Sequence, residues 1–286
     1  MEITTQTIKQ LREKTGAGMM DCQKALKETA GDMEKAIELL RKKGAATAIQ
    51  RADKIANQGL IITKINSGST KAVILEINSE TDFVARNEEF VSFGNLLADV
   101  LLVSTPENME KFLAMNLPTG KTVNDTLSEL VSKIGEKLDV KRFNVISSEN
   151  GIVDCYTHLG SKIGVLVEIK ATLSPETKTL ARDISLQVAA MNPMVASREE
   201  MPKEKIDSEL EIYRQLAKNE GKPEQIAEKI ATGRLEKYFQ EVVLNEQIFI
   251  KDSTKSIKDV VAEIGKSKNE EIKISRFIRY QLGETK

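Results

Sequence analysis

The side chains suited to catalysis or metal binding are few in this sequence. The chain of 286 residues has one histidine, His158, and two cysteines that lie far apart, Cys22 and Cys155. A single histidine excludes a zinc site built on several histidines and argues against a Ser-His-Asp nucleophile. His158 stands at the end of a predicted strand, just before Gly160, so chemistry alone favours a structural role at the surface. We therefore expect no enzyme activity, no metal site and no cofactor.

Two short segments look like the end of a nucleotide-binding loop: GKT at 120–122 and GKS at 265–267. A phosphate-binding loop also needs a glycine five residues before its Gly-Lys pair. Those positions hold Met115 and Val260, and neither segment follows a buried strand pattern. We predict that the chain itself binds no nucleotide.

The stretch INSETDFVARNEE (77–89) places Asp82 and Phe83 between a strand-like run (72–77) and a helix start at 87–89. In one interpretation Asp82 assists the helix start and Phe83 packs back as a hydrophobic staple. In the other, Phe83 is exposed on a short rigid connection, as binding hot spots are. The complete helix start at 87–89 weakens the first interpretation, but both stay open.

Two neighbouring methionines, Met19 and Met20, follow the segment Gly-Ala-Gly at 16–18. Successive residues of a helix point about 100° apart, so the two side chains cannot both face a core. We expect at least one of them to be exposed. Exposed methionine is an adaptable surface for a partner's helix.

The segment 41–54 is locally basic. A solvated helix face is the simpler explanation, and RNA contact is the alternative. The basic residues are Arg41, Lys42, Lys43, Arg51 and Lys54.

Length and composition indicate a globular protein of more than one domain, with 40% hydrophobic and 30% charged residues. No apolar run approaches the roughly 20 residues of a membrane span, and the first ten residues lack a signal pattern. The two distant cysteines fit a reducing compartment. We expect a cytoplasmic protein without membrane contact. A net charge of -1 and 4% aromatic residues count against a dedicated nucleic-acid binder.

Glycines divide the first fifty residues, because Gly16, Gly31 and Gly44 each follow a short helical pattern. The patterns predict helices at about 4–14 and 19–30, and a third that begins after Asp32. We interpret 1–45 as a domain of three helices and 46–58 as a linker, which we expect to be helical.

The next part of the chain contains an internal duplication. Gly59, Gly68 and Glu76 recur 92 residues later as Gly151, Gly160 and Glu168. Each set is predicted to form two strands followed by a helix, and the shared pattern indicates an α+β core. The predicted strands are 60–65, 74–78, 152–157 and 166–170, and the helices are 88–103 and 176–191. The units differ after the second strand, where TDFV (81–84) corresponds to an ordinary helix start, LSPE (173–176).

Residues 202–237 read as an antiparallel helical hairpin with a narrow apolar seam and a turn at 221–223. A strand-like run (242–250), a helix (255–266) and a last strand (274–282) follow. The expected division is 59–150 for the first core half, 151–201 with 238–254 for the second, 202–237 for the hairpin insertion, and 255–286 for a short C-terminal module.

Two long segments, LREKTGAGMMDCQKAL (11–26) and INSETDFVARN (77–87), resemble the bacterial translation elongation factor Ts family. The similarity extends to GSKIGVLVEIK (160–170), DISLQVAAMNP (183–193) and GKPEQIAEKI (221–230). It implies a non-enzymatic guanine nucleotide exchange factor for the GTPase elongation factor Tu. It also implies a ubiquitin-associated-like N-terminal domain before the two-part core and the hairpin.

The resemblance also implies roles for particular residues. The loop Thr81, Asp82, Phe83 and Val84 would enter the G domain of elongation factor Tu beside its magnesium and phosphate site. The N-terminal domain would grip another helix of that domain through Arg12, Met19 and Met20, and His158 in the second core half would face the other domains. A homo-oligomer or a two-plus-two complex stays open. The alternative function is an RNA-binding accessory factor that uses 41–54, with a steep dependence on salt.

Overall fold

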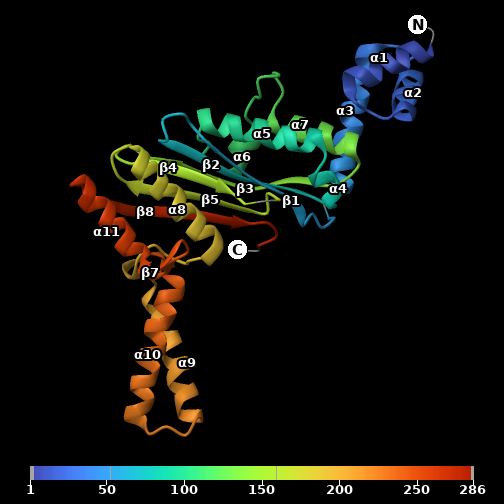
Figure 1. The fold of residues 1–286 in the computed structure, drawn as a ribbon. Coiled ribbons are helices and arrows are strands. Elements are labelled where there is room, and N and C mark those ends of the chain that lie inside the picture. The colour runs from blue at the N-terminus through green and yellow to red at the C-terminus, as the bar shows by residue number, and fades with distance from the viewer. Residues whose placement is uncertain (1–2, 52, 159, 285–286) are drawn as a thin grey trace.

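The computed structural model describes residues 3–51, 53–158 and 160–284. It is a mixed α+β structure with a group of N-terminal helices and small antiparallel sheets. Figure 1 shows the N-terminal helices at one end, a layered region of sheets and helices in the middle, and a helical hairpin that projects from the other end.

The N-terminal helices are α1 (Thr5–Thr15), α2 (Met19–Glu28) and α3 (Met33–Gln50). Gly16 ends α1 in the left-handed conformation, where glycine has no steric cost, and its N–H bonds the Arg12 carbonyl. The Asp32 carboxylate accepts two backbone N–H groups at the start of α3, as predicted. The shared core consists of Ile8, Leu11, Ala17, Cys22, Ala25, Leu26, Ala36 and Leu40.

The prediction that the third helix ends at Gly44 was wrong, because α3 continues to Gln50. Gly44 faces helix α7 (Val123–Ile134), and a Cβ atom there would lie 2.9 Å from the Ser132 Cβ. Arg41 pairs with Asp125 of α7 at 2.7 Å close by. This glycine permits a close helix–helix contact and does not end a helix.

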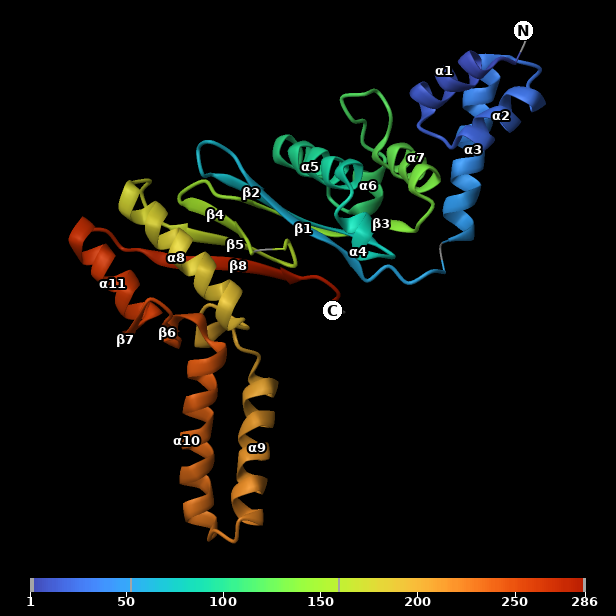
Figure 2. The ribbon, with the colours of Figure 1, turned by 45° about the vertical axis from the view of Figure 1, so that its right-hand side comes forward.

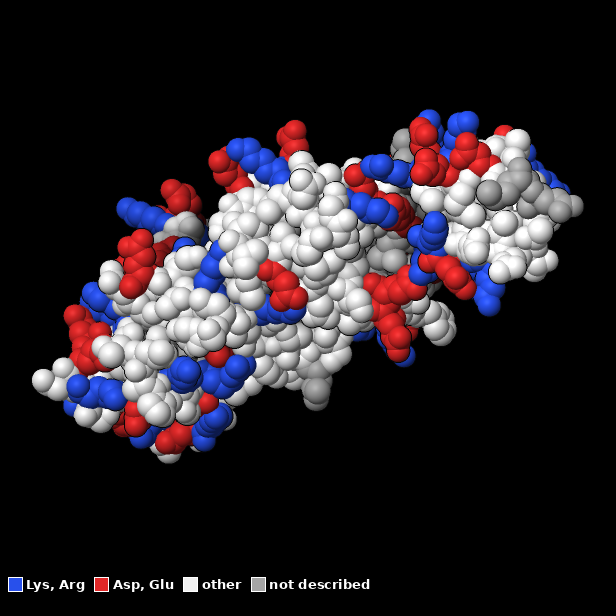
Figure 3. Space-filling model, turned by 90° about the horizontal axis from the view of Figure 1, so that it is seen from above, with Lys and Arg blue, Asp and Glu red and all other residues white. Residues whose placement is uncertain are grey.

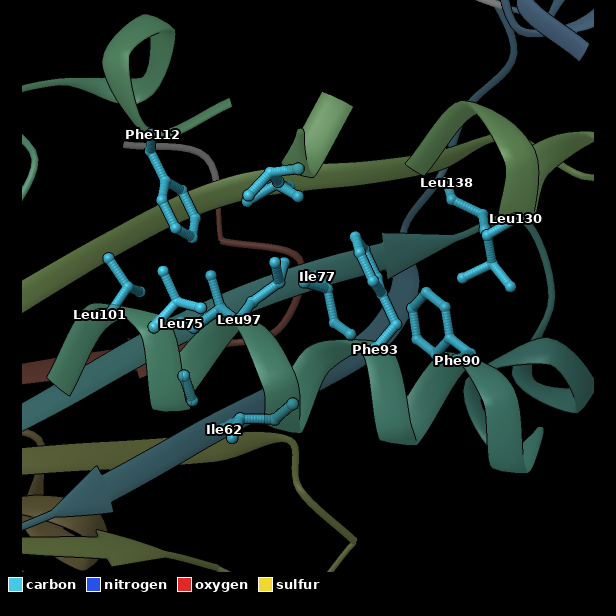
Figure 4. Close-up of a cluster of buried hydrophobic side chains, with 14 of the residues drawn as sticks. Ile62, Leu75, Ile77, Phe90, Phe93, Leu97, Leu101, Phe112, Leu130 and Leu138 are labelled. Carbon is cyan, nitrogen blue, oxygen red and sulfur yellow. The ribbon is translucent and has the colours of Figure 1, made fainter. Parts of the chain in front are cut away.

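The first sheet contains β1 (Gln58–Ile65), β2 (Lys71–Ser79) and β3 (Leu138–Ser147), which are antiparallel in that order. One face is covered by α5 (Glu88–Val103), α6 (Met109–Leu113) and α7. Figure 4 shows side chains of α5 pointing toward those of the sheet. The labelled members of this core are Ile62, Leu75, Ile77, Phe90, Phe93, Leu97, Leu101, Phe112, Leu130 and Leu138.

The second sheet contains β4 (Ile152–Thr157), β5 (Ile163–Lys170) and β8 (Lys273–Gln281), also antiparallel in that order. Helices α8 (Pro175–Met191) and α11 (Ile257–Lys268) cover its outer face. The inner faces of the two sheets pack together, which gives four layers (Figures 1 and 2). The buried residues between the sheets are Ile61, Ala72, Ile74, Ile146, Val153, Leu166 and Tyr280.

Helices α9 (Lys203–Asn219) and α10 (Glu224–Val242) form an antiparallel hairpin that projects from the second sheet's side, as Figure 2 shows. The strand predicted over 242–250 was wrong in most of its length. The end of α10, the 3-10 turn η2 (Leu244–Glu246) and the two-residue strand β6 (Ile248–Phe249), paired with β7 (Asp252–Ser256), occupy it. Val243 is buried with Met201, Leu235 and Phe239 at the base of the hairpin, and Leu244 and Phe249 are buried in the core of the second sheet.

The close approach of the two sheets generates a prediction about Gly164 in β5. A Cβ atom at this position would lie 2.4 Å from Ile61 Cγ2 and 3.1 Å from Ile74 Cδ1. Overpacking of this kind costs about 1–3 kcal/mol, so Gly164→Val should lower the free energy of unfolding by that amount. Gly233→Ala in α10, where a Cβ meets open space, is the control and should cause no loss. Chemical denaturation measures both, and equal stability of the two variants would contradict the packing described.

Candidate functional site

Phe83 lies on a one-turn helix, α4 (Asp82–Ala85), between β2 and α5. Its side chain is 82% exposed, whereas Phe90 on α5 is 1% exposed. The staple interpretation of Phe83 was therefore wrong. Val84 packs against the first core and Ala85 is buried, so α4 is attached to the core through these two residues while Phe83 faces solvent.

Thr81 begins this turn. Its Oγ1 accepts the Val84 N–H at 3.4 Å, so Thr81 and not Asp82 is the N-cap. Asp82 lies in the first turn, where a carboxylate is favoured by the helix dipole. It forms a 2.9 Å ion pair with Arg86, whose side chain is largely exposed, whereas that of Asp82 is half-exposed. The turn thus presents an apolar ring and a carboxylate side by side to solvent.

Two glutamates that sequence analysis missed hold the turn. Glu136 accepts the Thr81 N–H at 3.0 Å and the Thr81 hydroxyl at 2.8 Å. Glu80 accepts the Lys137 N–H at 2.6 Å and pairs with Arg51 at 2.7 Å. The Lys137 N–H and then the Arg51 guanidinium hold the pKa of Glu80 below its usual range. These contacts join residues that are 29, 55 and 57 positions apart in the sequence, so no local pattern predicts them.

A groove runs beside this turn and has walls from both sheets. Thr81, Asp82, Phe83 and Arg86 line one side, and the turn after β4, with Ser161, lines the other. The Ser161 carbonyl accepts the Ile61 N–H at 2.7 Å, which joins the two walls.

His158 is exposed at the start of the same β4–β5 turn, as expected. Its Nδ1 lies 2.9 Å from the Tyr156 hydroxyl, and its backbone N–H bonds the Ile163 carbonyl. The structure thus brings the turn that carries His158 to the groove beside Phe83.

Met19 and Met20 are both exposed, at 40% and 66%, in the first turn of α2, while Cys22 two residues on is fully buried. Arg12 is also exposed, in the last turn of α1. The prediction that at least one methionine is exposed is confirmed. These residues lie on the N-terminal helices, in a separate part of the molecule from α4 (Figure 1).

Four of the five basic side chains of the segment 41–54 form ion pairs with acidic side chains. Figure 3 shows Lys and Arg interspersed with Asp and Glu on the N-terminal helices. These pairs favour the simpler explanation, a solvated and paired helix face, for the part of the segment that the structure describes. The ion pairs are Arg41–Asp125, Lys42–Glu38, Lys43–Asp21 and Arg51–Glu80.

The two segments that look like phosphate loops have structural roles. Thr122 caps α7 by accepting the Asp125 N–H at 3.0 Å. Gly265 lies inside α11, and a Cβ there would be 2.8 Å from the Glu270 carbonyl oxygen. In the part of the chain that the structure describes, no three His, Cys, Asp or Glu side chains are placed to share a metal ion. Among the same residues, none of the helices has the length and apolar character of a membrane span.

An exposed aromatic side chain on a fixed turn, with a second exposed apolar set on separate helices, is characteristic of a protein that docks onto another protein. The family model for elongation factor Ts matches residues 80–284. Elongation factor Ts of Chloroherpeton thalassium is 49% identical, with 99% of each chain covered. That of Chlorobium phaeobacteroides is 48% identical with the same coverage, and that of Clostridium perfringens is 46% identical over 99% of this chain and 93% of the relative.

The chain belongs to the elongation factor Ts family. Members of this family are non-enzymatic nucleotide exchange factors for elongation factor Tu in translation elongation.

The contrast in burial between two phenylalanines can be tested in the free protein. Phe83→Ala should change the free energy of unfolding by less than about 0.5 kcal/mol, because its side chain leaves no cavity. Phe90→Ala, the matched control, should cost about 3–5 kcal/mol because it empties a buried site. Thermal and chemical unfolding of both variants measure this. A large loss for Phe83→Ala would mean that its ring packs on the protein in solution.

Proposed function

We propose that this chain promotes GDP release by inserting Phe83 beside the magnesium and phosphate site of elongation factor Tu. The observation that carries the proposal is an 82% exposed Phe on a turn that is fixed at its start and at Ala85. Binding is reciprocal: a factor that prefers the nucleotide-free state of its partner weakens nucleotide binding by the same factor. A rigid wedge that fits only the disturbed magnesium site supplies this preference.

The other residues of the turn have supporting roles in this proposal. Thr81 caps α4 and fixes its direction, and Val84 anchors it to the core. The exposed Asp82 carboxylate approaches the partner's metal region and repels the anionic phosphates. The half-exposed side chain of Asp82 and its surface pairing with Arg86 support this role, since a surface ion pair contributes little to stability and is readily exchanged.

A second contact forms through the N-terminal helices. Met19 and Met20, with Arg12, grip another helix of the partner's G domain, and the turn that carries His158 faces the partner's other domains. Exposure of these side chains supports both contacts. We propose that the protein acts in the cytoplasm, as a translation factor. A homo-oligomer or a two-plus-two complex with elongation factor Tu stays a prediction.

We also propose that the core consists of two copies of one β-β-α-α-β unit. Gly59 and Gly151 support this, because a Cβ at each would strike the carbonyl of Ile77 and Ile169, which are also 92 residues apart. The bulges fall at matching places, between Glu76 and Ile77 and between Glu168 and Ile169. Ion pairs also recur: Glu76–Arg142 matches Glu168–Arg276.

The finer division of the chain follows from this proposal. Residues 1–45 form a ubiquitin-associated-like domain, 46–58 a linker whose first residues are the last turn of α3, and 59–150 the first core half. Residues 151–201 with 238–254 form the second half, and 255–286 a C-terminal module that contributes α11 and β8 to that half. The hairpin (202–237) is an insertion, since it stands where the first unit has only α6 and its loops.

The wedge role of Phe83 predicts a change in exchange rate. Burying a Phe contributes about 1.5–3 kcal/mol, and 1.4 kcal/mol is about tenfold. Phe83→Ala should therefore slow catalysed GDP release by roughly ten- to a hundredfold, as measured by stopped flow with a fluorescent GDP at subsaturating factor. Val103→Ala, at a residue that is 86% exposed at the end of α5, is the control and should leave release unchanged. Unchanged release with Phe83→Ala would refute the assignment.

The second contact predicts a loss of affinity. Replacing Met19 and Met20 together by Ala should weaken association with nucleotide-free elongation factor Tu by about tenfold or more, because two exposed apolar side chains lose their contact area. The melting temperature should move little. Titration calorimetry measures the affinity. Normal binding accompanied by a large drop in melting temperature would mean that both side chains pack in the protein's own core and do not contact the partner.

A further inference from the structure

The geometry around Thr81 explains how a single helical turn keeps a fixed direction. α4 has four residues, and a helix this short is not stable by its own hydrogen bonds. Its N-cap residue, Thr81, is held from outside by Glu136, which lies between the C-terminus of α7 and the start of β3. One carboxylate oxygen accepts the Thr81 N–H at 3.0 Å, and the other accepts the Thr81 hydroxyl at 2.8 Å.

The Thr81 hydroxyl that bonds Glu136 also bonds the turn that carries Phe83. Thr81 Oγ1 donates its proton to Glu136, and its lone pair accepts the Val84 N–H. The carboxylate therefore fixes which rotamer Thr81 adopts, and that rotamer caps α4. Hydrogen bonds to an ionised carboxylate are the stronger kind, so the carboxylate holds the cap more firmly than a neutral acceptor would.

A reciprocal contact lies next to it. Glu80 accepts the Lys137 N–H, just as Glu136 accepts the Thr81 N–H. Each of the two segments, 80–81 after β2 and 136–137 before β3, thus supplies one glutamate that accepts a backbone N–H of the other segment.

The second sheet contains a related contact, and comparing the two shows which part of the arrangement belongs to the fold and which part is particular to the turn with Phe83. The Thr172 N–H and hydroxyl both donate to Glu270 Oε1, at 2.6 and 2.9 Å. Glu270 follows the C-cap of α11 as Glu136 follows the C-cap of α7, so the carboxylate is part of a repeated design. There it precedes α8, a helix of 17 residues that has its own capping box at Ser174. Only in the first sheet does this carboxylate hold a turn with an exposed Phe.

We propose that Glu136 is a positioning residue for nucleotide exchange, which acts through Thr81 on the direction of Phe83. The inference rests on the wedge role proposed above for Phe83. Glu136 is half-buried. In this proposal it acts on the partner only through Phe83, because its removal leaves Phe83 present but free to take directions that do not fit. The maximal rate of exchange should fall more than the affinity does.

A double-mutant cycle in the full chain tests this, with GDP release from elongation factor Tu measured over a range of factor concentrations. Glu136→Ala removes two bonds to a charged group and should lower the maximal release rate by about tenfold, with a smaller change in the half-saturating concentration. Glu136→Gln keeps one good acceptor, so its maximal release rate should lie between that of the native factor and that of Glu136→Ala. In a Phe83→Ala background, Glu136→Ala should have no further effect, because both changes act through one side chain.

Glu270→Ala is the matched control. It removes the corresponding carboxylate and should leave exchange at the native rate. Unchanged exchange with Glu136→Ala, when Phe83→Ala slows it, overturns the positioning role alone. An equal further loss in the Phe83→Ala background also overturns it, since the effect would not pass through Phe83. Unchanged exchange with Phe83→Ala refutes the wedge itself. If Glu136→Ala does not fold, Glu136→Asp, whose shorter side chain does not reach Thr81, takes its place with the same expectations.

Discussion

The packing of the two sheets against each other is the interaction on which the rest of the structure depends. Ile61 and Ile74 of the first sheet meet Leu166 of the second, and all three are fully buried. Gly164 lets β5 approach β1 closely enough for the Ser161 carbonyl to bond the Ile61 N–H. Because of this contact, the turn of the second sheet lies beside the turn that carries Phe83. The groove therefore belongs to neither sheet alone.

A second constraint is the exposure of an aromatic ring on a turn that cannot relax. An unconstrained chain would lower its free energy by folding Phe83 onto a nearby apolar surface. The cap at Thr81, the buried Ala85 and the contact of Val84 with the core prevent this. In the proposed function, the hydrophobic contribution of the ring is reserved for the complex with elongation factor Tu. A protein without catalytic side chains can then alter the rate of another protein's reaction through binding energy alone.

Much of the fold could be predicted where one face of an element is buried. Helix α5 and strand β4 agree with the predicted bounds, and α8 differs by one residue, because their apolar residues follow a clear period. Strand β3 was not predicted, since it is an edge strand whose alternation is diluted by Lys141 and Arg142. Helix α7 does carry an amphipathic pattern that could have predicted it.

The candidate site was predicted only in part. Phe83 and the two methionines could be selected from the sequence, because each stands where the neighbouring residues leave its apolar side chain no place in the core. The contacts of Glu80 and Glu136 have none, since their partners lie 57 and 55 residues away. The misassignment of Gly44 has the same origin: the residue that requires a glycine there, Ser132, is on another helix. Long-range contacts decide these positions, and local periodicity does not report them.

The central claim is that Phe83 acts on the partner's magnesium site, and the magnesium dependence of exchange tests it most directly. GDP release from elongation factor Tu would be followed with the native factor and with Phe83→Ala, first at millimolar magnesium and then with magnesium chelated. The account predicts that the native factor is much faster than Phe83→Ala when magnesium is present, and that the ratio of the two rates falls toward one when it is removed. A ratio that stays the same in both conditions would contradict the account, because Phe83 would then act without reference to the metal.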